Sequence, residues 1–198
     1  MRNYYTIQKD WESFRALFEK MNHTQEYVVL RNWENYYDDL SVEGKSDIDI
    51  LCENRQKFAD ALGAARLNRH TYNYAIRVEG KDVFLDLRSP GDGYYCKEWE
   101  LAMLKERQKH SLGFYIMDDE NYFYSLLYHV LIHKTMVTVA YQNKLQLMMS
   151  HIFEETVKDD MVKQLNEFMR FKRYRYSLCS DHIPGIETQI NKIYIGGV

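Results

Sequence analysis

The clearest alternation of polar and apolar residues in the chain lies at 47–52, directly after a Gly-Lys-Ser turn signal at 44–46. It begins Asp-Ile-Asp-Ile, and successive strand residues point to opposite faces of a sheet. The pattern therefore predicts a strand with Asp47 and Asp49 on one face and two isoleucines on the other. Such a strand is either a solvated edge or a platform for Mg²⁺, which prefers carboxylate oxygens.

The spacing of apolar residues also predicts the other elements of the first 118 residues. We expect helices over 8–21, 55–67 and 97–106, strands over 26–30, 71–78 and 83–88, and an extended stretch at 112–117. Asn54 is placed to cap the second helix. The tight-turn sequence Glu-Gly-Lys-Asp at 79–82 joins two of the strands into a hairpin, which carries a further acid, Asp86.

After Asp118 the apolar spacing becomes purely helical, with helices expected over 121–139, 143–153 and 157–174 and an extended or frayed tail at 181–198. We therefore predict an α+β protein. Residues 1–118 form a small mixed sheet flanked by helices, and residues 119–198 form a C-terminal helical lobe with an extended tail.

Composition narrows the classes of partner. The formal net charge is −3, so no global field attracts nucleic acid or an anionic membrane, and the basic cluster at 170–175 is better explained as a solvated helix end. Three cysteines without CxxC spacing indicate a reducing compartment and exclude a cysteine-based zinc site. No signal peptide and no apolar run of about 18 residues are visible, so a soluble, cytoplasmic protein is expected. The oligomeric state stays open.

Three acids stand on predicted strands: Asp47, Asp49 and Asp86. Strands are depleted in Asp, so three acids flanked by aliphatic residues are unusual. If the two strands are neighbours, the three carboxylates converge. Two Mg²⁺ ions held there, with Mn²⁺ as an alternative, would bind a triphosphate and activate a hydroxyl for in-line attack.

The order of helix, strand, loop, Gly-Lys-Ser-Asp-Ile-Asp-Ile, helix and acid-bearing hairpin resembles the nucleotidyltransferase fold of the DNA polymerase β superfamily, over about residues 8–90. That family carries an hG[GS] turn, a [DE]h[DE]h strand and a third acid on a later strand. Asp47, Asp49 and Asp86 match its three acids. The segments Leu-Arg-Asn-Trp-Glu-Asn and Ser-Asp-Ile-Asp-Ile-Leu resemble segments of nucleotidyltransferase-like proteins of surface-polysaccharide gene clusters.

The resemblance implies a metal-dependent enzyme in which these three acids are catalytic and bind the metal. It would transfer a nucleotidyl or phosphoryl group from ATP or another nucleoside triphosphate to a small hydroxylated acceptor, such as a sugar or polyol, in polysaccharide biosynthesis. One departure stands out, because Leu30-Arg31-Asn32 replaces the hG[GS] turn. The Arg31 guanidinium could hold a phosphate in place of glycine backbone amides, which leaves the transferred group open.

Several further residues are candidates for contacts with the nucleotide or acceptor: Arg31, Asn32, Ser46, Arg88, Asp92, His129, His133 and Lys134. The two histidines are four residues apart on one helix face and are either structural or directed toward a ligand. Val130 follows the first of them, which excludes a zinc-protease motif. Lys134 is a candidate triphosphate contact, and Asp92 is either a base for the acceptor hydroxyl or a turn residue.

The same motif is compatible with two other functions. The fold could be catalytically silent and serve as a ligand- or partner-binding module. It could also be a toxin-type nucleotidyltransferase, which would arrest growth through the same acids.

Overall fold

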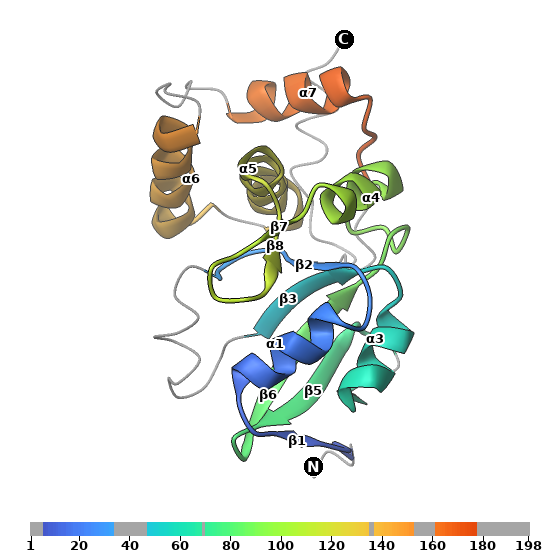
Figure 1. Ribbon diagram of the computed structural model, residues 1–198. Helices are drawn as coiled ribbons and strands as arrows, with labels where there is room; N and C mark the ends of the chain where they lie inside the picture. Colours follow the sequence, from blue (N-terminus) through green and yellow to red (C-terminus); the bar gives the residue numbers. More distant parts are fainter. Residues whose placement is uncertain (1–5, 34–46, 69, 135–136, 153–160, 178–198) are drawn as a thin grey trace. The chain divides into compact units, whose positions relative to one another are not determined.

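The computed structural model describes residues 6–33, 47–68, 70–134, 137–152 and 161–177 (Figure 1). Contacts between residues divide the chain into two units. The first is Met1–Asp92 with Lys97–Met117, and the second is Gly93–Cys96 with Asp118–Val198. Within the described residues, no helix is both long enough and apolar enough to cross a membrane.

The first unit is built on a mixed sheet. Its strands are β1 (Asp10–Trp11), β2 (Tyr27–Val29), β3 (Asp47–Cys52), β4 (Ala65–Arg66), β5 (Asn73–Val78), β6 (Lys81–Arg88), β7 (Gln108–Lys109) and β8 (Tyr115–Ile116). They are ordered β1-β5-β6-β3-β2-β8-β7, and β4 pairs with β5. The strand β3 runs parallel to β6 and antiparallel to β2. The predicted strand at 47–52 and the predicted hairpin are both present.

The helices in the described part of this unit are α1 (Phe14–Asn22), α3 (Arg55–Leu62) and α4 (Lys97–Lys105). The first starts later than predicted, because β1 pairs with β5 and Ser13 Oγ then caps α1 by accepting from the Ala16 amide. Asn54 caps α3 as predicted, with its Oδ1 3.0 Å from the Lys57 amide. This helix ends earlier than predicted, at Gly63, whose left-handed φ of 65° closes it.

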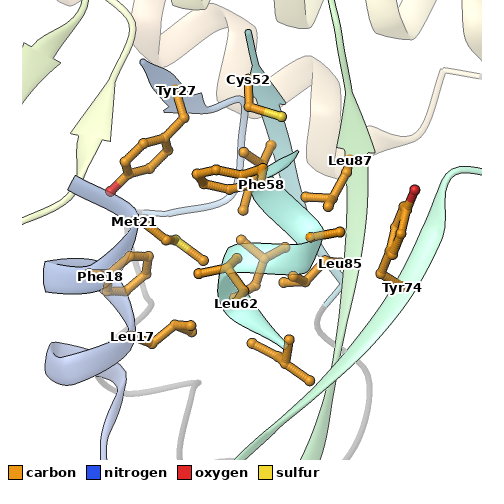
Figure 2. Packing of buried hydrophobic residues seen from close by; sticks show 14 of the residues in the cluster. Leu17, Phe18, Met21, Tyr27, Cys52, Phe58, Leu62, Tyr74, Leu85 and Leu87 are labelled. Carbon is orange, nitrogen blue, oxygen red and sulfur yellow. The ribbon is translucent and has the colours of Figure 1, made fainter. Parts of the chain in front are cut away.

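The core of the unit lies between the sheet and α1 and α3 (Figure 2). Figure 2 shows Leu17, Phe18 and Met21 of α1 directed toward Phe58 and Leu62 of α3 and toward the strands.

The buried residues of β3 and β6 in this core are Ile48, Ile50, Cys52, Leu85 and Leu87. The residues that alternate with them, including the acids, therefore lie on the opposite face of the sheet. A slip of one residue would bury acids in the core and expose these aliphatic side chains, so hydrophobic burial fixes the register.

The second unit contains α5 (Asp119–Tyr128), a π-helical turn η1 (His129–His133), α6 (Val139–Ile152) and α7 (Met161–Lys172). The single helix predicted over 121–139 is wrong, because the chain changes to π geometry at His129 and is extended at Lys134. At the end of α7, Lys172 Nζ lies 2.6 Å from Glu120 Oε2. The tail at 181–198 lies outside the described residues.

Candidate active site

Two acids of the first unit face each other across neighbouring strands. In the parallel ladder of β3 and β6, Asp49 is the partner of Asp86, and Asp47 is the partner of Phe84. Asp47 and Asp49 share a strand face because they are two residues apart. The strand pairing on which convergence of the three acids depends is therefore present.

Each of the two inner acids contacts an arginine. Arg31 Nη2 lies 2.8 Å from Asp49 Oδ1, and Arg88 Nη2 lies 2.9 Å from Asp86 Oδ2. The two arginine side chains are only 7% and 5% exposed. An arginine stays charged when buried, so these contacts are charge-assisted hydrogen bonds in a poorly solvated environment.

Local structure explains how Arg31 reaches the site. It follows β2 directly, and the amide of the preceding Leu30 donates to the Asp49 carbonyl at 2.9 Å, which continues the pairing of β2 with β3. Asn32 then adopts a left-handed backbone with φ 59°. Asn tolerates this conformation better than most residues, so a left-handed turn forms here without glycine.

The sheet face that carries Asp47, Asp49 and Asp86, here called the acid face, raises the pKa of two of these carboxyls, Asp47 and Asp86. Burial raises the pKa of Asp86 to about 6, an effect that the neighbouring Arg88 opposes and the Asp49 charge reinforces. Partial burial and the Asp49 charge also raise the pKa of Asp47 above its ordinary value. Asp86 can therefore exchange a proton near neutral pH.

A second layer of side chains holds Arg88. Its guanidinium carbon lies 4.8 Å from the centre of the Tyr72 ring, and the guanidinium carbon of Arg55 lies 4.0 Å from the same ring. Arg55 Nη1 in turn lies 3.2 Å from Asp92 Oδ2, which also accepts from the Ser89 amide. The Asp92 side chain thus stabilises the turn after β6 and also binds Arg55.

The sequence did not reveal Tyr72 or Arg55. No motif marks them, and their positions depend on strand register. The Leu87 amide donates to the Tyr72 carbonyl at 3.0 Å, which places Tyr72 beside the end of β6 that carries Arg88.

The remaining candidates lie elsewhere in the chain. Ser46 lies outside the described residues. His129, His133 and Lys134 belong to the second unit, where the two histidines contact Tyr94 and Lys134 is exposed.

Two observations on the acid face bear on whether it can bind a metal ion, and they point in opposite directions. In the part of the chain that the structure describes, no group of three or more His, Cys, Asp and Glu side chains is arranged as a metal centre. Asp86 Oδ1, however, is buried and accepts no hydrogen bond from any described residue. A buried carboxylate oxygen without a donor is costly, and a cation is a partner that removes this cost. The donor chemistry of Asp47, Asp49 and Asp86 therefore fits a divalent cation.

The chain matches no protein-family model, and no curated protein or solved structure is significantly similar to it.

Proposed function

We propose that the protein has a nucleotidyltransferase fold and transfers a nucleotidyl or phosphoryl group from a nucleoside triphosphate to a hydroxyl of a small acceptor, such as a sugar or polyol. One observation carries the proposal. Asp49 and Asp86 are register partners on parallel strands, and each has a buried arginine beside it. Carboxylates suit Mg²⁺ and guanidinium groups suit phosphates, so one sheet face presents both groups that this transfer uses.

Asp47, Asp49 and Asp86 would hold the divalent cation. When bound, Mg²⁺ or Mn²⁺ neutralises charge on the departing phosphate group and lowers the pKa of the attacking hydroxyl.

Asp86 is suited to accept the proton of the acceptor hydroxyl. Its pKa of about 6 makes it a stronger base than an ordinary aspartate while leaving it mostly ionised at neutral pH. Arg88 binds Oδ2, whereas Oδ1 accepts no hydrogen bond from a described residue. Oδ1 is therefore the Asp86 oxygen available either to the cation or to the proton of the acceptor hydroxyl.

Arg31 and Arg88 would bind the phosphates. A guanidinium has five N–H donors in a fixed plane, so one edge can keep its carboxylate while another receives a phosphate oxygen. Because both side chains are almost fully buried, they are held in place before the substrate arrives.

The same contacts favour a second candidate, a catalytically silent ligand-binding module. Arg31 and Arg88 already neutralise the charges of Asp49 and Asp86 without a cation. A module of this kind would bind an anionic ligand through the arginines and would not require Mg²⁺.

The deciding experiment is a transfer assay with Mg²⁺, a panel of sugars and polyols, and triphosphates labelled at either the α- or the γ-phosphate. Label from the α-phosphate on an acceptor shows nucleotidyl transfer, and label from the γ-phosphate shows phosphoryl transfer. Asp49→Asn should lower the rate by roughly 100-fold or more. Asp82→Asn is the matched control, because Asp82 forms an exposed pair with Arg77 at 2.8 Å at the other end of β6.

The outcomes separate the candidates. Triphosphate binding that is independent of Mg²⁺, with no label on any acceptor, favours the silent module. No calorimetric binding of any triphosphate, with or without Mg²⁺, rejects both.

A further inference from the structure

Two imidazoles of the second unit face each other through the same ring nitrogen. His129 Nδ1 lies 3.3 Å from His133 Nδ1, and Tyr94 Oη lies 3.0 Å from His129 Nδ1. His129 and Tyr94 are buried, at 6% and 4% exposure, while His133 is partly exposed. Three potential ligand atoms are thus gathered where one of the histidines meets solvent.

The protonation of the imidazole nitrogens indicates which kind of ligand this cluster can bind. His133 Nε2 lies 3.1 Å from the Tyr94 carbonyl oxygen, which can only accept, so Nε2 carries a proton. In a neutral ring Nδ1 then carries a lone pair, and this lone pair faces His129 Nδ1. Two nitrogens at this distance need a proton or a metal ion between them. An anion would instead require N–H groups on both nitrogens.

The distances suit a metal ion. Zinc–nitrogen bonds of about 2.0–2.1 Å in tetrahedral geometry place two ligand nitrogens about 3.3 Å apart. The contact from His133 Nε2 to a backbone carbonyl is the type that orients metal-binding imidazoles and fixes their tautomer.

The backbone and the neighbouring rings hold the histidines in this arrangement. The Lys134 amide donates to the His129 carbonyl at 3.1 Å, a π-helical bond over five residues, and single π turns often mark functional sites. The ring centre of His133 lies 4.1 Å from that of Tyr94, 5.3 Å from that of Tyr128 and 5.7 Å from that of Tyr95. Little reorganisation is then required on binding.

We propose that His129 and His133, together with Tyr94, bind a borderline transition-metal ion such as Zn²⁺, with a fourth position open to water or an external ligand. Imidazole ligands suit Zn²⁺, whereas Mg²⁺ prefers oxygen, so this site is chemically distinct from the acid face. The inference does not rest on the proposed transfer activity.

The test is a calorimetric titration of the metal-stripped, full-length protein with Zn²⁺, together with the visible absorption of the Co²⁺ form. We expect one ion per chain. His129→Ala and His133→Ala should each weaken binding about 10- to 100-fold or more, since changes even to residues around the ligands have effects of this size. Tyr94→Phe should weaken it less, because the ring packing remains. His151→Ala, on the exposed surface of α6, is the control and should bind as the wild type does.

X-ray absorption of the zinc-loaded wild type provides a measurement that does not depend on the folding of variants, and two imidazole ligands are expected. The proposal fails if binding is not saturable, if fewer than two imidazoles coordinate the ion, or if the double variant His129→Ala/His133→Ala binds as tightly as the wild type. A proton shared between the two rings would then account for their contact.

Discussion

Asp49 and Asp86 occupy matching positions on neighbouring parallel strands, and each carboxylate contacts its own buried arginine. Burying two ion pairs on one sheet face carries a large desolvation cost. Replacing a buried ion pair with well-packed apolar residues is often neutral or stabilising, so stability alone does not account for two such pairs on one face. Their chemistry is the better explanation.

Removing one partner should show how far Asp49 depends on Arg31. We expect Arg31→Met to lower the free energy of unfolding by about 3 kcal/mol at pH 7, because Asp49 keeps a poorly solvated charge without its partner. Urea unfolding measures the loss. Arg77→Met, in the exposed pair with Asp82, should cost less than about 1 kcal/mol. Equal losses in the two variants would contradict the inference, and adding Asp49→Asn to Arg31→Met should restore part of the stability.

The pKa of Asp86 predicts how stability depends on pH. Burial raises it from an ordinary value of 3.8 to about 6, so between these values the folded chain binds more protons than the unfolded chain. The contribution of Asp86 to stability is therefore greatest at low pH and is lost as pH rises toward 6. An asparagine side chain does not titrate in this range, so the Asp86→Asn variant lacks this part of the pH dependence.

The unfolding free energy of Asp86→Asn relative to the wild type should thus increase by about 2 kcal/mol between pH 4 and pH 7. Urea unfolding of both proteins with a chelator present measures this difference. A difference that is constant across this pH range would show that Asp86 has an ordinary pKa.

Tyr72 should stabilise the site through its ring and not through its hydroxyl. Arg55 and Arg88 both lie over the ring, at 4.0 and 4.8 Å from its centre. We expect Tyr72→Leu to lower stability by about 1 kcal/mol and to weaken triphosphate binding, because the cation–π contacts are lost. Tyr72→Phe keeps the ring and should match the wild type in urea unfolding and in calorimetry. A Phe variant as weak as the Leu variant would instead assign the effect to the hydroxyl.

The left-handed backbone of Asn32 should distinguish alanine from glycine at this position. With φ at 59°, Asn32→Ala should cost about 1–2 kcal/mol, whereas Asn32→Gly should be neutral or stabilising. Thermal unfolding measures the order. If Arg31 has taken over phosphate binding, Asn32→Gly should also retain the transfer activity. Equal stability of the two variants would indicate that the turn relaxes.

Local patterns predicted much of the first unit. The alternation at 47–52, the tight turn of the hairpin and the Asn54 cap are signals within a few residues, and the structure confirms all three. The two-residue strand β8 lies within the stretch expected to be extended at 112–117, whereas β1, β4 and β7 were not predicted, because a strand that short forms only through its partner. Trp11, for example, fits the spacing of a helix but instead pairs with β5.

The candidate site was also predicted only in part from the sequence. Alternation placed the acids on one face, but their ion pairs with Arg31 and Arg88 depend on the turn after β2 and on the register of β6. The sequence associated Arg31 with phosphate, whereas in the structure its guanidinium lies against Asp49. The histidine pair was visible from its spacing of four residues. Tyr94 was not, because 35 residues separate it from His129.

The assignment of Gly93–Cys96 to the second unit has a practical consequence for dissecting the protein. A fragment that ends at Met117 keeps every strand of the sheet but also keeps Tyr94 and Tyr95, whose hydroxyls contact His129 and Ser125 later in the chain. Both tyrosines would then present aromatic surface to water, and the fragment should self-associate. A single proteolytic cut therefore cannot separate the two units, because Gly93–Cys96 belongs with the residues that follow Met117.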